Sequence, residues 1–102
     1  MRAYSIVFEL VTSGSGEVVS GMLMPRSMIH EPSGGWLQLA EDASDAITMA
    51  NVNANAQLAR VSEEMRAYVH CSVRAKEVWP LVAVIGGWRR ASRSDLAERE
   101  DQ

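Results

Sequence analysis

Apolar and polar residues alternate most regularly over residues 67–75. The apolar positions of this stretch are Ala67, Val69, Cys71, Val73 and Ala75. Strict alternation predicts a β-strand with one buried face, because successive side chains of a strand point to opposite sides of the sheet. Some of the same residues also continue a helical stripe from the preceding segment. A helix running on to Ala75 is therefore the alternative interpretation.

Two further alternating stretches lie near the N-terminus, over residues 4–12 and 17–24. They flank residues 13–16, a Ser-Gly-Ser-Gly segment that tolerates the positive φ of tight turns. This arrangement predicts a β-hairpin. Pro25 ends the second strand, because proline has no N–H to donate to a sheet.

A helix is predicted over residues 44–61. Its inner face is marked by apolar residues at spacings of three and four, namely Ile47, Ala50, Ala54, Leu58 and Val61. Asp42 or Ser44 can cap its first turn. A short strand is predicted just before the helix, at 36–40. The apolar run 81–85 predicts a strand that is buried on both faces and ends at Gly86 and Gly87.

The predicted element order is β-β-β-α-β-β, which places the chain in the α+β class. We expect a mostly antiparallel sheet with one helix, or an OB-like partly open barrel, since an OB-fold has this order. Residues 1–91 are predicted to form a single α+β domain. Residues 92–102 are charged and have no apolar stripe, so we expect a disordered C-terminal tail.

Composition narrows the classes of function. The chain has 102 residues and a net charge of −3, with 47% hydrophobic and 23% charged residues, which is ordinary for a globular domain. Residues 93–102 hold two basic and four acidic side chains, so the rest of the chain is nearly neutral. The uncharged run 78–88 is too short to span a membrane, and the start shows no signal peptide. We therefore expect a cytoplasmic protein with no membrane partner.

The sequence favours a binding protein over an enzyme, since no phosphate loop, dinucleotide fingerprint or hydrolase motif is present. We expect no catalytic residue, cofactor or metal site. Cys71 is the single cysteine, and its neighbour His70 would point to the opposite face of a strand. An enzyme with a pocket under the long 25–35 loop is a further alternative, with His30 and Glu31 as acid-base groups.

The main hypothesis is a small interaction module that acts through protein-protein contacts and self-associates, most simply as a homodimer. Methionine adapts to varied partners, and the edge strands of a sheet need protection. The proposed partner-binding residues are Met22, Met24, Met28, Ile29 and Trp36.

The alternative is an OB-like protein that binds single-stranded nucleic acid. Exposed aromatic rings stack on bases, and arginines contact phosphates. The candidate residues are Trp36, Arg74, Trp88, Arg89 and Arg90. The nearly neutral charge counts against this alternative, because affinity for nucleic acid depends strongly on cationic contacts.

Overall fold

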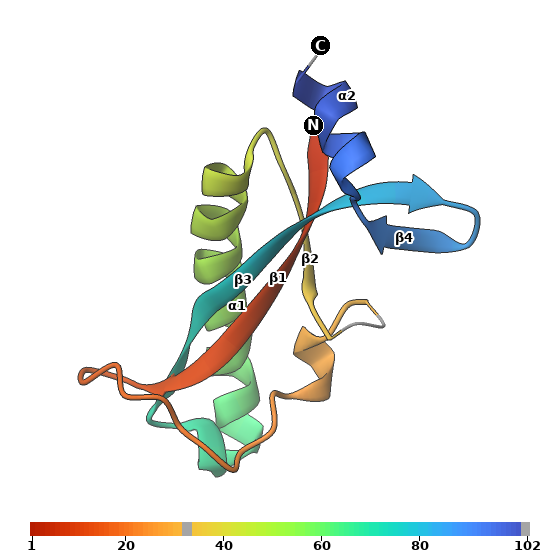
Figure 1. Cartoon of the computed structure of the whole chain (residues 1–102). Coiled ribbons are helices and arrows are strands. Elements are labelled where there is room, and N and C mark those ends of the chain that lie inside the picture. Colours follow the sequence, from red (N-terminus) through yellow and green to blue (C-terminus); the bar gives the residue numbers. More distant parts are fainter. Residues whose placement is uncertain (32–33, 101–102) are drawn as a thin grey trace.

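Four antiparallel strands form one sheet in the order β2-β1-β3-β4, with the long helix α1 against one face (Figure 1). The computed structural model describes residues 1–31 and 34–100. The strands are β1 (Arg2–Thr12), β2 (Trp36–Ala40), β3 (Cys71–Val84) and β4 (Gly87–Arg90). The helices are α1 (Ala43–Glu64) and α2 (Arg93–Glu100), with short 3-10 turns η1 (Arg26–Met28) and η2 (Arg66–Tyr68).

The predicted α+β class is confirmed: the chain has one antiparallel sheet and one main helix. The two edge strands, β2 and β4, do not pair with each other, so the sheet is open and not closed into a barrel. The element order matches the prediction only roughly, because both strands predicted after the helix overlap β3 and the strand β4 lies outside the predicted strands. The segment 17–24 also differs from the prediction. That segment forms a single bridge, between Val11 and Val18, in place of a second hairpin strand. Gly21 has a φ of 81° and interrupts the extended backbone there.

The helix α1 lies along the sheet because small residues line its inner face. Ala46, Ala50 and Ala54 are fully buried and Leu58 nearly so, at a regular spacing of four residues. Alanines at this spacing let the helix axis approach the strands closely. The helix begins at the predicted N-cap Asp42, whose carboxylate accepts a hydrogen bond of 2.8 Å from the N–H of Asp45.

The strand β3 joins two predicted strands into one element of 14 residues. The turn η2 occupies Arg66–Tyr68, so the strand begins at Cys71 and not at residue 67, and the helical alternative is wrong. The ladder between β1 and β3 shifts register between Val7 and Phe8. This shift leaves Lys76 as an extra residue on β3, as in a β-bulge.

The two faces of the sheet differ in what covers them. Tyr4, Ile6 and Leu10 of β1 face α1 and belong to the hydrophobic core. Residues that alternate with them, among them the buried Ala3, Ser5 and Val11, point to the side opposite α1, and we call that side the open face. Directly paired residues share a face, so the open face also carries Trp79 of β3 and, through the pairs Leu81–Arg90 and Ala83–Trp88, two side chains of β4.

The C-terminal segment forms the helix α2, while residues 101–102 lie outside the described residues. None of the α2 side chains that the structure describes, those of residues 93–98, is buried. The helix therefore adds no described side chain to the core. The boundary predicted at residue 92, between a core domain and a tail, stays a prediction.

Candidate functional site

The end of the β3–β4 hairpin extends beyond the rest of the sheet (Figure 1). The ladder between β1 and β3 reaches Leu81, whereas β4 pairs with β3 from Leu81 to Val84. Residues 82–90, which we call the arm, therefore form a ribbon of only two strands. The molecule is correspondingly elongated, with principal extents of 46 × 28 × 22 Å. A two-stranded ribbon is marginally stable in water, so this projection is unusual unless something packs against it.

The arm exposes apolar side chains at its tip. Ile85 is fully exposed, and Val84 and Trp88 expose 42% and 40% of their surface. Ile85 and Gly86 form the two-residue turn, where Gly86 adopts a φ of 88° that favours glycine. The sequence interpretation of 81–85 as a strand buried on both faces is thus wrong beyond Leu81, because the ladder between β1 and β3 ends there.

An aromatic and cationic cluster lies on the open face of the arm and at its base. The guanidinium carbon of Arg90 lies 4.2 Å from the centroid of the Trp79 ring, a cation–π contact. Trp88 shares this face with Arg90, because the two residues alternate along β4. Trp79 and Trp88 are both more than a third exposed. The open face of the arm therefore presents two indole rings beside one guanidinium group.

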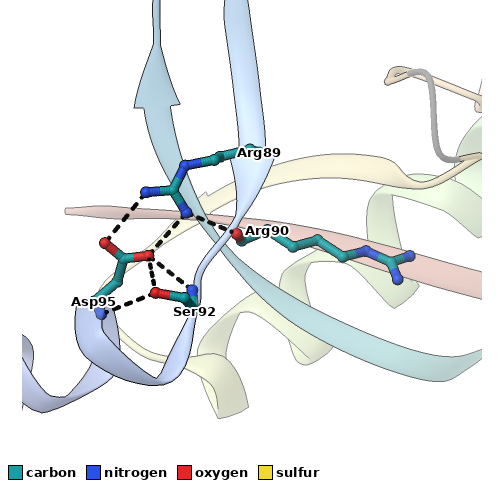
Figure 2. A network of polar contacts seen from close by, with 4 residues as sticks. All are labelled: Arg89, Arg90, Ser92 and Asp95. Atoms are coloured by element: carbon teal, nitrogen blue, oxygen red, sulfur yellow. Dashed lines mark hydrogen bonds and ion pairs between the residues drawn. The ribbon is translucent and has the colours of Figure 1, made fainter.

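Arg89 points the other way and ties β4 to α2 (Figure 2). Its guanidinium group donates to Asp95 at 2.9 Å and to the carbonyl oxygen of Arg90 at 3.1 Å. Asp95 also accepts from the N–H and hydroxyl of Ser92, at 2.7 and 2.9 Å, and its own N–H donates to the Ser92 hydroxyl. This reciprocal pair is a capping box that starts α2.

The same contacts set the ionisation of the pair. The hydrogen bond from Arg89, followed by those from Ser92, holds the pKa of the Asp95 carboxyl well below its ordinary value of 3.8. The hydrogen bond to Asp95 in turn raises the pKa of Arg89. Arg89 is therefore a charge already matched by a carboxylate, whereas the Arg90 charge lies against an aromatic ring.

The five residues predicted to bind a partner do not form one exposed surface. Met28 and Trp36 are core residues, exposed by 2% and 9%, which corrects the expectation that both lie at the surface. Met22 and Met24 are partly buried and pack against the core. Of the five, Ile29 is the one that is exposed, at 42%. The burial has a local cause, since the turn η1 after Pro25 directs Met28 inward.

The residues predicted to bind nucleic acid are also separated. Trp36 is buried, and its indole N–H donates to Gln38 at 3.2 Å. Arg74 lies near the start of β3 and is paired with Glu9 at 2.7 Å. Ala83, the partner of Trp88, lies nine positions after Arg74 along β3, which corresponds to roughly 30 Å. The structure brings together Trp88 and Arg90 on one face, with Arg89 on the other.

The residues of the enzyme alternative hold the 25–35 loop in place. The His30 ring lies 4.2 Å from the Trp36 ring, and its Nδ1 accepts from the N–H of Leu37 at 3.3 Å. Glu31 accepts a hydrogen bond of 2.5 Å from the buried Ser5 hydroxyl. These contacts anchor the loop to β1 and β2. Residues 32 and 33 of the loop lie outside the described residues.

Within residues 1–31 and 34–100, no three His, Cys, Asp or Glu side chains gather where they could hold a metal ion. In that part of the chain no helix combines the length and apolar character needed to cross a membrane.

Sequence reasoning missed three residues of the arm and its base: Trp79, Val84 and Ile85. A signal for the arm was present, since an apolar run followed by a two-residue turn at Ile85 and Gly86 is typical of a hairpin. The pair Ser92 and Asp95 likewise has the spacing of a capping box and indicates the start of α2. Comparison of the chain with protein-family models, curated proteins and solved structures finds no match. Function is therefore inferred from the geometry.

Proposed function

We propose that this protein is a non-enzymatic interaction module that acts through protein-protein contacts and self-associates through the arm. The observation that carries the proposal is the exposure of Val84, Ile85 and Trp88 on a ribbon with no support from the rest of the sheet. Apolar side chains gathered at the end of a projection favour contact with another surface. A partner that packs against the arm would supply the burial that the monomer lacks.

The edge of the sheet supports the same proposal. β4 is an edge strand, and among the described residues no strand pairs with its outer side. Edge strands are often protected by charged side chains that would be left unpaired on association. On β4 this protection is weakened, because Arg89 is matched by Asp95 and Arg90 lies over Trp79. Strand addition at this edge would therefore bury few unmatched charges.

Substitution of Ile85 tests the proposal. Burial of an aliphatic side chain contributes about 1.5–3 kcal/mol, and a symmetric dimer buries Ile85 twice. Ile85→Asp is therefore expected to weaken dimerisation at least about 100-fold, since each 1.4 kcal/mol is a factor of ten. Light scattering coupled to size-exclusion chromatography would measure the mass of each variant across a dilution series.

Leu23→Asp is the matched control for this experiment. Leu23 is 84% exposed and lies in the segment after the first turn, away from the arm. Its replacement should leave the dimer intact, and circular dichroism should show unchanged folds for both variants. Equal masses for Ile85→Asp and the parent chain, with the parent dimeric, would exclude the exposed tip of the arm as part of the interface.

A second candidate function is binding of single-stranded nucleic acid, favoured by Trp88 and Arg90 on one face of the arm. An aromatic ring and a guanidinium group together provide stacking and phosphate contact. The net charge of −3 counts against it. Titration with oligo(dT) should then quench tryptophan fluorescence at low salt and lose this effect at high salt. No quenching at low salt would exclude a base-stacking site on the arm.

A further inference from the structure

The hydrogen-bonding phase of β4 determines which backbone groups are available to another strand. The N–H of Ala91 donates to the carbonyl of Pro80 at 2.8 Å, which makes Ala91 a residue whose backbone faces β3. Hydrogen-bonded residues alternate along an antiparallel strand, so Arg89 and Gly87 also face β3. The backbone groups of Trp88 and Arg90 therefore point outward. The Arg90 carbonyl does accept from a side chain there, that of Arg89.

Two copies of β4 can use all these outward groups in one antiparallel register. If Arg89 lies on the twofold axis, Trp88 of each copy is opposite Arg90 of the other, and each such pair exchanges hydrogen bonds in both directions. If Trp88 lies on the axis, only the two Trp88 residues pair in this way. If Arg90 lies on the axis, the two Arg90 residues are the only two β4 residues that exchange backbone hydrogen bonds with each other. The register about Arg89 thus satisfies the most backbone groups.

The side chains favour the same register. Trp88 and Arg90 lie on the open face in each copy, and a twofold axis perpendicular to the sheet keeps the two open faces on one side. Each Trp88 ring would then lie beside a guanidinium group of the second copy, a cation–π arrangement formed twice. On the other face, the two Arg89 side chains meet. Their repulsion is reduced because each is already paired with Asp95.

We propose that two copies of this chain join their β4 strands antiparallel about Arg89, so that the two four-stranded sheets become one continuous sheet. This inference rests on the proposed self-association. It adds which strand of the second copy pairs with β4, and the register and symmetry of that pairing. Trp88 and Arg90 are the residues whose side chains and backbone groups contact the second copy. Strand pairing between edges also accounts for a β4 strand whose outward backbone has no other strand beside it in the described part of the chain.

Cysteine cross-linking tests the register. In a Cys71→Ser background, Arg89→Cys places two thiols on the twofold axis in a pair with no hydrogen bonds, where Cα atoms lie roughly 4.5 Å apart. This separation lies within the range of a disulfide. Trp88→Cys and Arg90→Cys are the flanking controls. In this register the two copies of each introduced cysteine are not opposite each other: they are displaced by two residues along the strand, roughly 6.6 Å, in addition to the spacing between the strands. Mild oxidation should link the first variant and neither control, at concentrations where sedimentation shows each to be associated.

A second measurement uses the native sequence and avoids loss of the Arg89–Asp95 ion pair. In a dimer assembled from isotopically labelled and unlabelled copies, a filtered nuclear Overhauser spectrum should connect the Hα atoms of Arg89 in the two copies. The short Hα–Hα distance is specific to a pair with no hydrogen bonds in an antiparallel ladder.

The outcomes separate this inference from the function on which it rests. A link at Trp88 or Arg90 in place of Arg89, or a dimer with no contact between β4 strands, would overturn the register and leave self-association standing. A parent chain that stays monomeric would overturn both.

Discussion

The side-chain amide of Asn55 takes the place of a strand beside β3. Its Nδ2 donates to the carbonyl of Val73 at 3.1 Å, and its Oδ1 accepts from the N–H of Val73 at 2.8 Å. At this position β3 has β1 on one side, while α1 crosses the other. Val73 is only 4% exposed, so water cannot easily replace the amide. Asn55→Ala would leave one buried N–H and one buried C=O without partners.

The cost of this substitution follows from the two lost hydrogen bonds. A buried backbone group left unpaired costs about 1–3 kcal/mol, and alanine returns about 0.5 kcal/mol through its higher helix propensity. We expect Asn55→Ala to lower the free energy of unfolding by about 1.5–5.5 kcal/mol, a large part of the stability of a small domain. Urea denaturation followed by circular dichroism would measure the loss, with an unchanged dependence on urea concentration.

Asn51→Ala is the matched control, one helical turn earlier on α1. The Asn51 Oδ1 is buried and has no hydrogen-bond partner among the described residues. Its removal should therefore leave the free energy of unfolding unchanged or raise it by up to about 1 kcal/mol. Equal losses for Asn51→Ala and Asn55→Ala would refute the claim that the Asn55 amide acts as a substitute strand.

Two further predictions concern a close contact and an ion pair. A Cβ added by Gly35→Ala would overlap the Oγ of buried Ser5 and approach the Glu31 Oε1 to 2.8 Å, so we expect a loss of about 1–3 kcal/mol in thermal denaturation. Ser5→Ala removes the closest of these overlaps and should restore part of the loss, and no restoration would contradict the steric cause. The pKa of Asp95 lies below its ordinary 3.8 in the folded chain, so its stabilising contribution is fully present above pH 3.8 and is lost as the pH falls below that value. Arg89→Gln should raise this pKa toward 3.8 in a carboxyl NMR titration, and an unchanged titration would show that Arg89 is not the main cause.

The sequence alone was sufficient to predict the elements in which apolar residues recur with one clear period. Residues 36–40 form the predicted strand, and the predicted helix over 44–61 lies within α1. In each case one pattern of apolar spacing dominates, and Asp42 marks where the helix begins. The segment 17–24 alternates equally well, but the turn at Gly21 and the lack of a long partner strand prevent it from joining the sheet.

The candidate site was harder to predict, because exposure depends on which neighbours a strand has. An apolar run such as 81–85 has the same pattern in a central strand and in a projecting ribbon, and only the end of the β1–β3 ladder at Leu81 distinguishes them. Met28 was misplaced for the opposite reason. It lies in an irregular segment, where no period shows that the chain turns the side chain back into the core.

Self-association through the arm is tested most directly by sedimentation equilibrium of the parent chain from roughly micromolar to millimolar concentration, beside Ile85→Asp. We expect the parent mass to rise from the 11.2 kDa of one chain toward twice that value, while Ile85→Asp stays at the mass of one chain over a wider range. A parent chain that keeps the mass of one copy throughout would contradict the account.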